Sequence, residues 1–183
     1  MLVKISRDTM YGIICYRAAL ESKDDAEAKS CAAQICQSVY DDANNGPGRE
    51  YMAKFCQPIE VTLKPEAVEL FQVYRKHRAF ANSLPNDKAI EAWYHKAREH
   101  AVAFVTAFLS QLTYRQEQLI VARYNEARYR WDMQNKALTE AERQEAYDWF
   151  QFWNNKTTFL TCLYYGAFED EKKLLQAAVQ AVQ

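Results

Sequence analysis

Residues Ala146–Phe168 read AYDWFQFWNNKTTFLTCLYYGAF and form the densest aromatic run of the sequence. On a helical wheel the large apolar side chains occupy one half of the cylinder, which is wider than the roughly 100° stripe of an ordinary surface helix. A helix with so wide an apolar half is expected to contact more than one neighbouring element. The apolar half comprises Trp149, Phe150, Phe152, Trp153, Phe159, Leu160, Leu163 and Tyr164.

One charged residue, Lys156, falls near the middle of this apolar half. Either the helix is continuous and Lys156 needs a carboxylate partner inside an interface, or Asn154-Asn155 divides the stretch into two helices. We expect a continuous helix, because neither glycine nor proline is present to break it. Within it we expect Trp149, Trp153 and Lys156 to contact a partner.

Residues that end helices are scarce in this chain, which contains four glycines and four prolines among 183 residues. Two pairs with the capping-box form, Thr113 with Gln116 and Thr139 with Glu142, mark helix starts. If the Thr113 pair is incidental, the segments on either side of it form one very long helix. The sequence predicts an all-α fold, an irregular bundle of about six helices in a single helical domain over residues 1–183.

The turn at 44–48 reads NNGPG and is the clearest break in the chain, so a sub-boundary of the domain would fall there. Beyond it Ile59, Val61 and Leu63 alternate with polar residues, as in a short strand. Its only candidate partner is Leu2–Ile5, so the β content is at most a minimal two-stranded element near the N-terminal third. The predicted helices are Arg7–Leu20, one opened by Ser22, Pro65–Asn82, one ending at Leu112, Tyr114–Lys136, one starting at Glu140, and Glu169–Val182.

The charge of the chain is balanced, with 23 basic and 24 acidic side chains and a formal net charge of −1. Such a chain has no overall field that attracts nucleic acid or an anionic membrane. No segment reaches the ~18 consecutive apolar residues of a membrane-spanning helix, and the N-terminal residues lack the order of a signal peptide. We therefore expect a cytoplasmic protein with no membrane partner.

The cysteines agree with a reducing compartment. They are five in number, and none belongs to a Cys-x-x-Cys pair. We expect free, mostly buried thiols rather than disulfides or a zinc knuckle. The five residues are Cys15, Cys31, Cys36, Cys56 and Cys162.

Four polar residues, Asp87, Glu91, His95 and Glu99, are spaced four apart and line one side of a predicted helix. Carboxylates and an imidazole in this arrangement could hold a metal or transfer protons. The same spacing is also that of the polar back of an amphipathic helix. Because no metal-binding, nucleophile or glycine-rich phosphate motif occurs in the chain, we predict no catalytic, cofactor-binding or metal-binding residues and no cofactor.

The basic run at 74–78, YRKHR, contributes a second set of candidate partner-binding residues, Arg75, Lys76 and Arg78. With its aromatic neighbours this run could contact phosphate or stack on bases, although such runs are commonly solvated helix faces. A second basic and aromatic mixture at 123–132 contains Glu126 and Asp132. Pairing within the helix is expected to neutralise much of that second charge.

Three functions are compatible with these patterns. We predict a non-enzymatic, aromatic-rich protein-interaction module, such as an adaptor, inhibitor, immunity-type or assembly subunit, that binds a protein partner or forms a homodimer. The first alternative is a nucleic-acid-associated helical protein that uses the local basic patch. The second is an enzyme whose site the fold assembles from scattered residues without any sequence motif.

Overall fold

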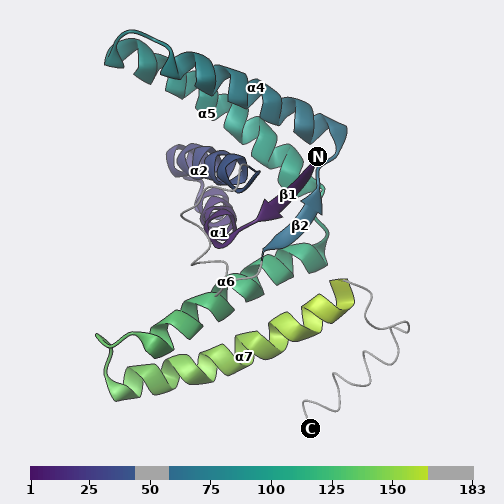
Figure 1. The fold of residues 1–183 in the computed structure, drawn as a ribbon, viewed down its shortest axis with the longest axis vertical. Helices are drawn as coiled ribbons and strands as arrows, with labels where there is room; N and C mark the ends of the chain where they lie inside the picture. The colour runs from purple at the N-terminus through teal and green to yellow at the C-terminus, as the bar shows by residue number, and fades with distance from the viewer. Residues whose placement is uncertain (44–57, 165–183) are drawn as a thin grey trace. The chain divides into compact units, whose positions relative to one another are not determined.

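The structure is a computed structural model that describes residues 1–43 and 58–164. In these ranges it contains six helices and one two-stranded sheet (Figure 1), which confirms the predicted all-α class with a minimal β element. The turn at 44–48 and the helix expected over Glu169–Val182 lie outside the described residues.

Contacts within the chain divide it into two compact units, Met1–Leu112 and Thr113–Gln183. The division falls at the Thr113 capping box. The helices before and after the 44–48 turn pack together within the first unit. That residues 1–183 form a single domain, with a sub-boundary at the 44–48 turn, stays a prediction.

The first two helices of the first unit, α1 (Arg7–Glu21) and α2 (Asp25–Ala43), form a helical hairpin. Lys23, between them, has a φ of 59°, a left-handed conformation that ends α1. Asp24 caps α2, because its Oδ1 accepts a hydrogen bond from the Glu27 backbone N–H at 3.0 Å. The prediction that Ser22 opens this helix is therefore wrong, and the Ser22 hydroxyl instead donates to the Ala18 carbonyl at 3.0 Å.

A close approach holds this hairpin together at Gly12 of α1. A Cβ atom built at Gly12 would lie 2.8 Å from Cγ1 of Ile35 on α2. Ile35 is fully buried, so its side chain has little room to move away. The absence of a side chain at Gly12 is thus what lets α1 and α2 pack this closely.

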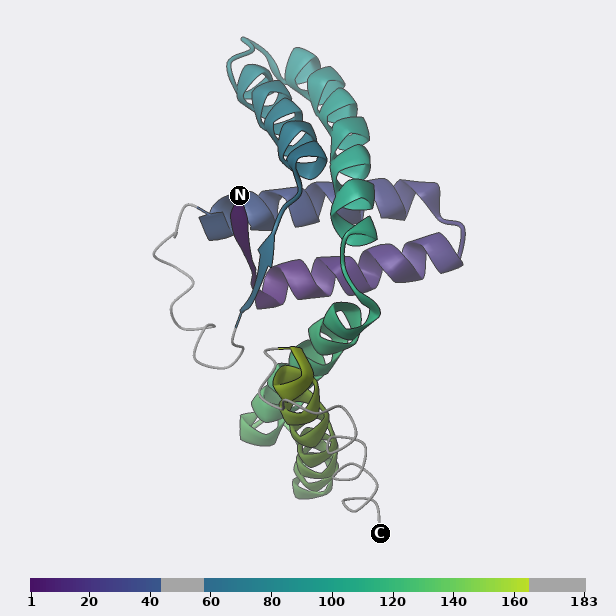
Figure 2. The same ribbon diagram turned by 90° about the vertical axis from the view of Figure 1, so that its right-hand side faces the viewer.

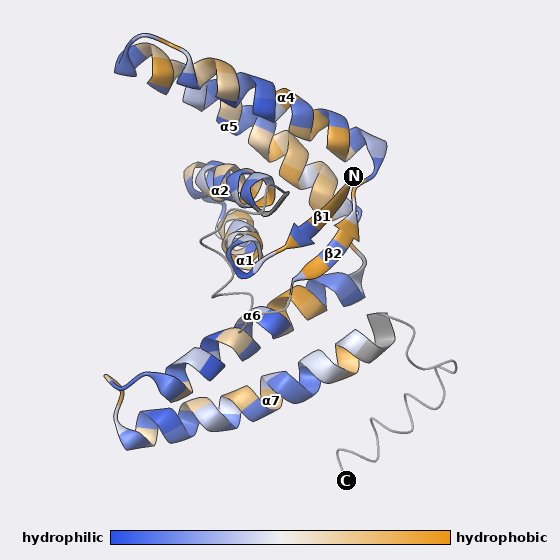
Figure 3. Cartoon of the chain, in the orientation of Figure 1, coloured by the Kyte–Doolittle hydropathy of each residue, from blue (hydrophilic) through white to orange (hydrophobic). Residues whose placement is uncertain are grey.

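A second hairpin, α4 (Pro65–Asn82) and α5 (Asp87–Ser110), packs across the first one, with α2 against α5 (Figure 2). Pro65 occupies the first turn of α4, as predicted, and the Asn86 side chain caps α5. The C-terminal half of α5 is its most hydrophobic part (Figure 3). There the Phe104 ring lies 5.0 Å from Phe71 and 5.8 Å from Phe108, centroid to centroid, and all three rings are buried.

The predicted strand pairing is confirmed. β1 (Leu2–Ile5) and β2 (Ile59–Thr62) are antiparallel, and each alternates buried with exposed residues. The register places buried residues opposite one another, so the sheet contributes one apolar face to the core. The buried pairs are Val3 with Val61 and Ile5 with Ile59.

The second unit contains a hairpin of α6 (Tyr114–Gln134) and α7 (Glu140–Tyr164). The predicted capping box at Thr113 is present: the Gln116 side chain accepts from the Thr113 N–H at 2.8 Å. The Gln116 N–H donates in return to the Thr113 hydroxyl at 3.2 Å. Since α5 ends at Ser110, the chain forms two helices here and not one long helix.

Candidate functional site

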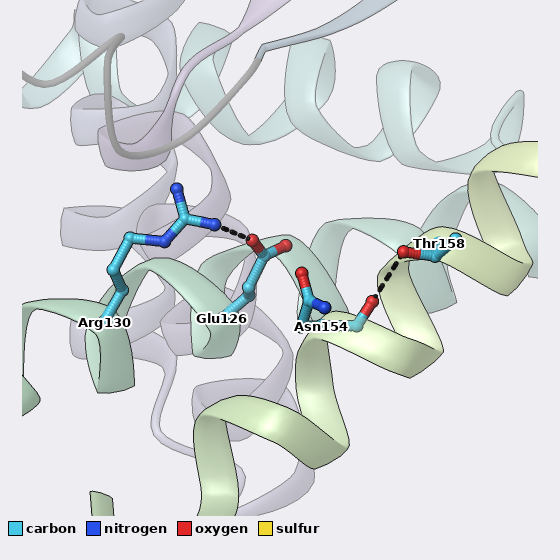
Figure 4. Close-up of polar contacts among 4 residues, drawn as sticks. All are labelled: Glu126, Arg130, Asn154 and Thr158. Atoms are coloured by element: carbon cyan, nitrogen blue, oxygen red, sulfur yellow. Dashed lines mark hydrogen bonds and ion pairs between the residues drawn. The ribbon is translucent and has the colours of Figure 1, made fainter. Parts of the chain in front are cut away.

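The helix α7 starts at its own capping box and runs without a break through Asn154-Asn155. The Glu142 N–H donates to the Thr139 hydroxyl at 3.3 Å, and the Glu142 carboxylate accepts from the Thr139 N–H at 2.7 Å. Further along, the Thr158 hydroxyl donates to the Asn154 carbonyl at 2.9 Å, one turn back along the same helix (Figure 4). The predicted continuous helix is thus confirmed.

The apolar half of α7 is wider than the part that becomes buried. The more buried positions of the helix follow one stripe, which includes Ala146, Phe150, Trp153 and Leu160. The rings beside that stripe remain in solvent: Trp149 is 44% exposed, Phe152 52% and Phe159 39%. We call these three residues the aromatic face.

Two rings of the aromatic face, Trp149 and Phe152, contact each other and neighbouring rings. Phe152 packs edge-on against Trp149 and Trp153, at centroid distances of 6.0 and 5.1 Å. Trp149 stacks with Tyr129 of α6 at 6.0 Å. These contacts restrict the orientations of Trp149 and Phe152, which lowers the entropy lost when another surface packs against them.

Lys156 lies next to this face and has neutral partners. Its Nζ donates to Oε1 of Gln118 on α6 at 3.5 Å and lies 5.0 Å from the centroid of the Trp153 ring. No carboxylate within the described ranges forms an ion pair with it. The expected carboxylate is therefore absent from this part of the chain, and an amide and an indole take its place.

The charges of the 123–132 mixture are paired as predicted. Arg130 donates to the Glu126 carboxylate at 2.5 Å (Figure 4), and Arg128 lies 3.8 Å from Asp132. Both pairs join residues four apart on α6. This part of the second unit therefore offers little unpaired positive charge.

The basic run on α4 does not form one surface. Arg75 and Lys76 are both exposed, and the guanidinium carbon of Arg75 lies 4.9 Å from the centroid of the Tyr40 ring of α2. The half-buried Arg78 donates from Nη1 to the Tyr74 hydroxyl at 3.0 Å. Two of the three predicted residues thus turn toward tyrosines.

Two hollows adjoin this run. The larger, of about 540 Å³, lies between α4 and α5. The smaller, of about 180 Å³, lies between α2 and α4. Tyr74 and Arg78 line both of them.

Three members of the polar line on α5, Asp87, Glu91 and His95, line the larger hollow, and Glu99 does not. They share that hollow with Arg78 of α4. Among the described residues no three His, Cys, Asp or Glu side chains converge as metal ligands would. Asp87, Glu91 and His95 therefore form one wall of a hollow that is lined by both acidic and basic side chains.

A histidine pair lies on the other side of the α4–α5 hairpin. The rings of His77 on α4 and His100 on α5 stack with their centroids 4.2 Å apart, and Trp93 lies 5.4 Å from His77. Burial, together with the nearby charges of His100 and Lys96, lowers the pKa of His77 below its ordinary value. His77 is thus held as a neutral ring at neutral pH.

The environments of Cys31 and Cys36 disfavour a reactive thiolate. Cys15, Cys31 and Cys36 are free thiols, as expected, and the other two lie outside the residues whose side chains are described. Burial and the adjacent Glu27 carboxylate raise the pKa of Cys31 to about 12, and burial raises that of Cys36. Nucleophilic chemistry needs the thiolate, which these environments disfavour.

Several residues of these sites were not among the predicted ones. Phe152 and Phe159 are exposed rings on the same side of α7 as Trp149, but the helical wheel does not show which part of an apolar half a neighbour covers. Tyr40 and Tyr94 were missed because they come from helices other than the one that carries the basic run.

None of the described helices is long and apolar enough to cross a membrane. No protein-family model matches the chain, and no curated protein or solved structure is significantly similar to it.

Proposed function

We propose that the chain is a non-enzymatic protein-interaction module that binds a protein partner through the aromatic face of α7. The observation that carries this proposal is the exposure of Trp149, Phe152 and Phe159, at 44%, 52% and 39%, on one side of one helix. Single exposed apolar residues are common, but adjacent exposed rings form a patch that water solvates poorly. Large aromatic residues are also those that contribute most to protein interfaces.

The surroundings of Lys156 indicate what kind of surface a partner would present. Its ammonium group lies at the edge of the aromatic face and has an amide and a ring as neighbours. A partner that covers the face would remove water from this charge, which is unfavourable unless the partner supplies a carboxylate. The matching surface is therefore apolar with one acidic residue. A second copy of the chain is one such partner if α7 pairs antiparallel, because Asp148 would then approach Lys156 of the other copy.

Nucleic-acid binding by the basic run has weaker support. Arg75 and Arg78 contact Tyr40 and Tyr74, whereas Lys76 is exposed and lines neither hollow. Binding along a nucleic-acid backbone requires several charges on one surface. An enzyme active site has no specific observation in its favour.

The proposal is tested by measuring complex formation with two changes on the face, Trp149→Ala and Phe152→Ala, made together. The purified chain is sized by light scattering, and tagged chain is then incubated with extract of the native host and the bound proteins are quantified. Truncating central aromatic residues of an interface costs about 2 kcal/mol or more, so the double variant should lose at least about tenfold in affinity.

The matched control is Tyr147→Ala. Tyr147 lies on the same helix and is 43% exposed, nearly as much as Trp149, but it belongs to the polar half of the cylinder. This control should retain the complex. If the double variant retains its complexes, or if Tyr147→Ala loses them equally, the aromatic face is not the contact surface.

A further inference from the structure

Among the described residues, the smaller hollow between α2 and α4 is lined by two guanidinium groups and no carboxylate. Its lining residues are Tyr40, Tyr74, Arg75, Arg78, Ala79 and Asn82. Because an arginine carries a full charge at any physiological pH, this lining holds two positive charges. A hollow with such a lining attracts anions.

Neither arginine is neutralised by the part of the chain that the structure describes. Arg75 contacts the face of the Tyr40 ring, and Arg78 donates one hydrogen bond to the neutral Tyr74 hydroxyl. No ion pair joins either of them to a described carboxylate. The half-buried Arg78, with its single neutral acceptor, and the exposed Arg75, with its ring contact, both retain N–H donors for an anion.

The other polar groups of the hollow also present donors. The Tyr74 oxygen accepts from Arg78 and so keeps its own O–H for a second partner. Burial raises the pKa of Tyr74, so this hydroxyl stays protonated at neutral pH. The Asn82 Oδ1 atom accepts from the Tyr94 hydroxyl at 2.6 Å, which leaves its NH₂ group to donate. Arg75, Arg78, Tyr74 and Asn82 thus each present at least one N–H or O–H donor to the hollow.

We propose that this hollow binds the phosphate group of a small phosphorylated, hydroxyl-bearing molecule. Two guanidinium groups balance the two negative charges of a phosphate monoester, whereas a single carboxylate would leave one charge unpaired. The remainder of the molecule extends past Arg78 into the larger hollow. There Asp87 and Glu91 accept hydrogen bonds from hydroxyl groups, and Tyr94 provides an apolar ring surface.

This proposal concerns the first unit alone and does not rest on the aromatic face of α7. It also differs from general binding of nucleic acid, because it depends on which basic residue of the run lines the hollow. Arg75 and Arg78 line it, and Lys76, which lies between them in sequence, lines neither hollow. Lys76 therefore provides a control with the same loss of charge on the same helix.

The test titrates the full chain with inorganic phosphate and with ribose 5-phosphate at low ionic strength. Binding is followed by NMR through the Nε–H signals of Arg75 and Arg78. Both ligands should shift these signals and leave those of distant arginines in place, and ribose 5-phosphate should bind more tightly than phosphate. Acetate and unphosphorylated ribose should shift them less at equal concentration.

Two variants locate the phosphate. Arg78→Gln should lower the affinity for both ligands by about tenfold or more, as expected for the loss of charge-assisted hydrogen bonds. Arg75→Gln should lower both affinities by a comparable factor. This variant keeps the hydrogen bond between Arg78 and Tyr74, so we expect it to fold as the wild type does. Lys76→Gln should change the affinity by no more than about twofold, the size expected of a solvated charge.

A third change tests the larger hollow. Removing its carboxylates with Asp87→Asn and Glu91→Gln should lower the affinity for ribose 5-phosphate. The affinity for inorganic phosphate should stay the same or rise. The proposal is overturned if the wild-type chain shows no shift with either ligand. It is also overturned if Lys76→Gln weakens binding as much as Arg78→Gln, or if a short single-stranded oligonucleotide binds with the same dependence on all three basic residues.

Discussion

Phe71, Phe104 and Phe108 of the first unit are fully buried, whereas Trp149, Phe152 and Phe159 of the second retain between 39% and 52% of their surface in solvent. The first unit surrounds its rings with two helical hairpins and a sheet. In the second, the described elements are two helices, and one helix covers only part of the other's apolar half. The same residue types therefore stabilise the fold in one unit and remain available for contact in the other.

The two units also differ in the partners of their arginines. In the second unit the arginines at 128 and 130 have carboxylate partners on their own helix. In the first, Arg75 and Arg78 face tyrosines and a hollow. Unpaired arginines beside a hollow and unburied rings on a helix are both features that folding alone does not require.

The largest expected effect is the difference between two Phe→Ala substitutions. Phe104→Ala should lower the free energy of unfolding by about 3–5 kcal/mol, since it opens a cavity in a closed core. Phe152→Ala should lower it by about 1 kcal/mol or less, because the ring loses only its edge contacts. Urea unfolding followed by far-UV circular dichroism measures both values. Equal losses would mean that Phe152 belongs to a core.

The next effect concerns the tight packing of the first unit. Gly12→Ala should lower the free energy of unfolding by about 1 kcal/mol, because the overlap with Ile35 costs more than the gain in helix propensity. In an Ile35→Ala background the overlapping Cγ1 atom is gone, so the same change should become stabilising. A double-mutant cycle by urea unfolding measures this coupling. Equal effects in both backgrounds would show that the helices move apart without cost.

A smaller effect is a pH dependence that arises from the α4–α5 hairpin. The pKa of His77 is lowered in the folded chain, so the unfolded chain takes up the proton at a higher pH. Stability is therefore complete above the ordinary histidine pKa of about 6.5 and declines as pH falls from there toward the lowered value. Urea midpoints recorded between about pH 5 and about pH 8 follow this decline, which His77→Phe should reduce. An unchanged profile in that variant would assign the effect to other groups.

The smallest expected effect on stability is that of Lys156→Met. The side chain has only neutral partners among the described residues, so the free energy of unfolding should change by less than about 0.5 kcal/mol or rise. Complex formation should nevertheless weaken, since the partner's carboxylate loses its cation. Thermal or urea unfolding and the sizing assay separate the two effects. A clearly less stable chain would indicate an internal ion pair instead.

Local signals predicted most of the fold. Pro65, the Thr113 capping box and the alternation around Val61 each act through neighbouring residues, and each structure they predict is present. The cap of α2 was misassigned because Ser22 and Asp24 can both cap a helix, and the left-handed residue between them decides the outcome.

The candidate sites were less predictable from the sequence. The pattern places Trp149 and Trp153 on the same apolar half, but only the packing shows that Trp149 remains exposed and Trp153 is more buried. Likewise Arg75 and Lys76 are adjacent and equally basic in the sequence. Their difference depends on Tyr40, which another helix contributes. The exposure of a side chain and its contacts with other helices depend on residues distant in sequence, so the spacing of residue types along one helix does not predict them.

The central claim is that the exposed rings of α7 are a binding surface and not part of a core. It is tested most directly by the amount of complex that the chain forms, alone and in host extract, for three proteins: wild type, the Trp149→Ala and Phe152→Ala double variant, and Tyr147→Ala. We expect the double variant to lose the complex while its far-UV spectrum is unchanged, and Tyr147→Ala to retain it. A double variant that retains the complex would contradict the account.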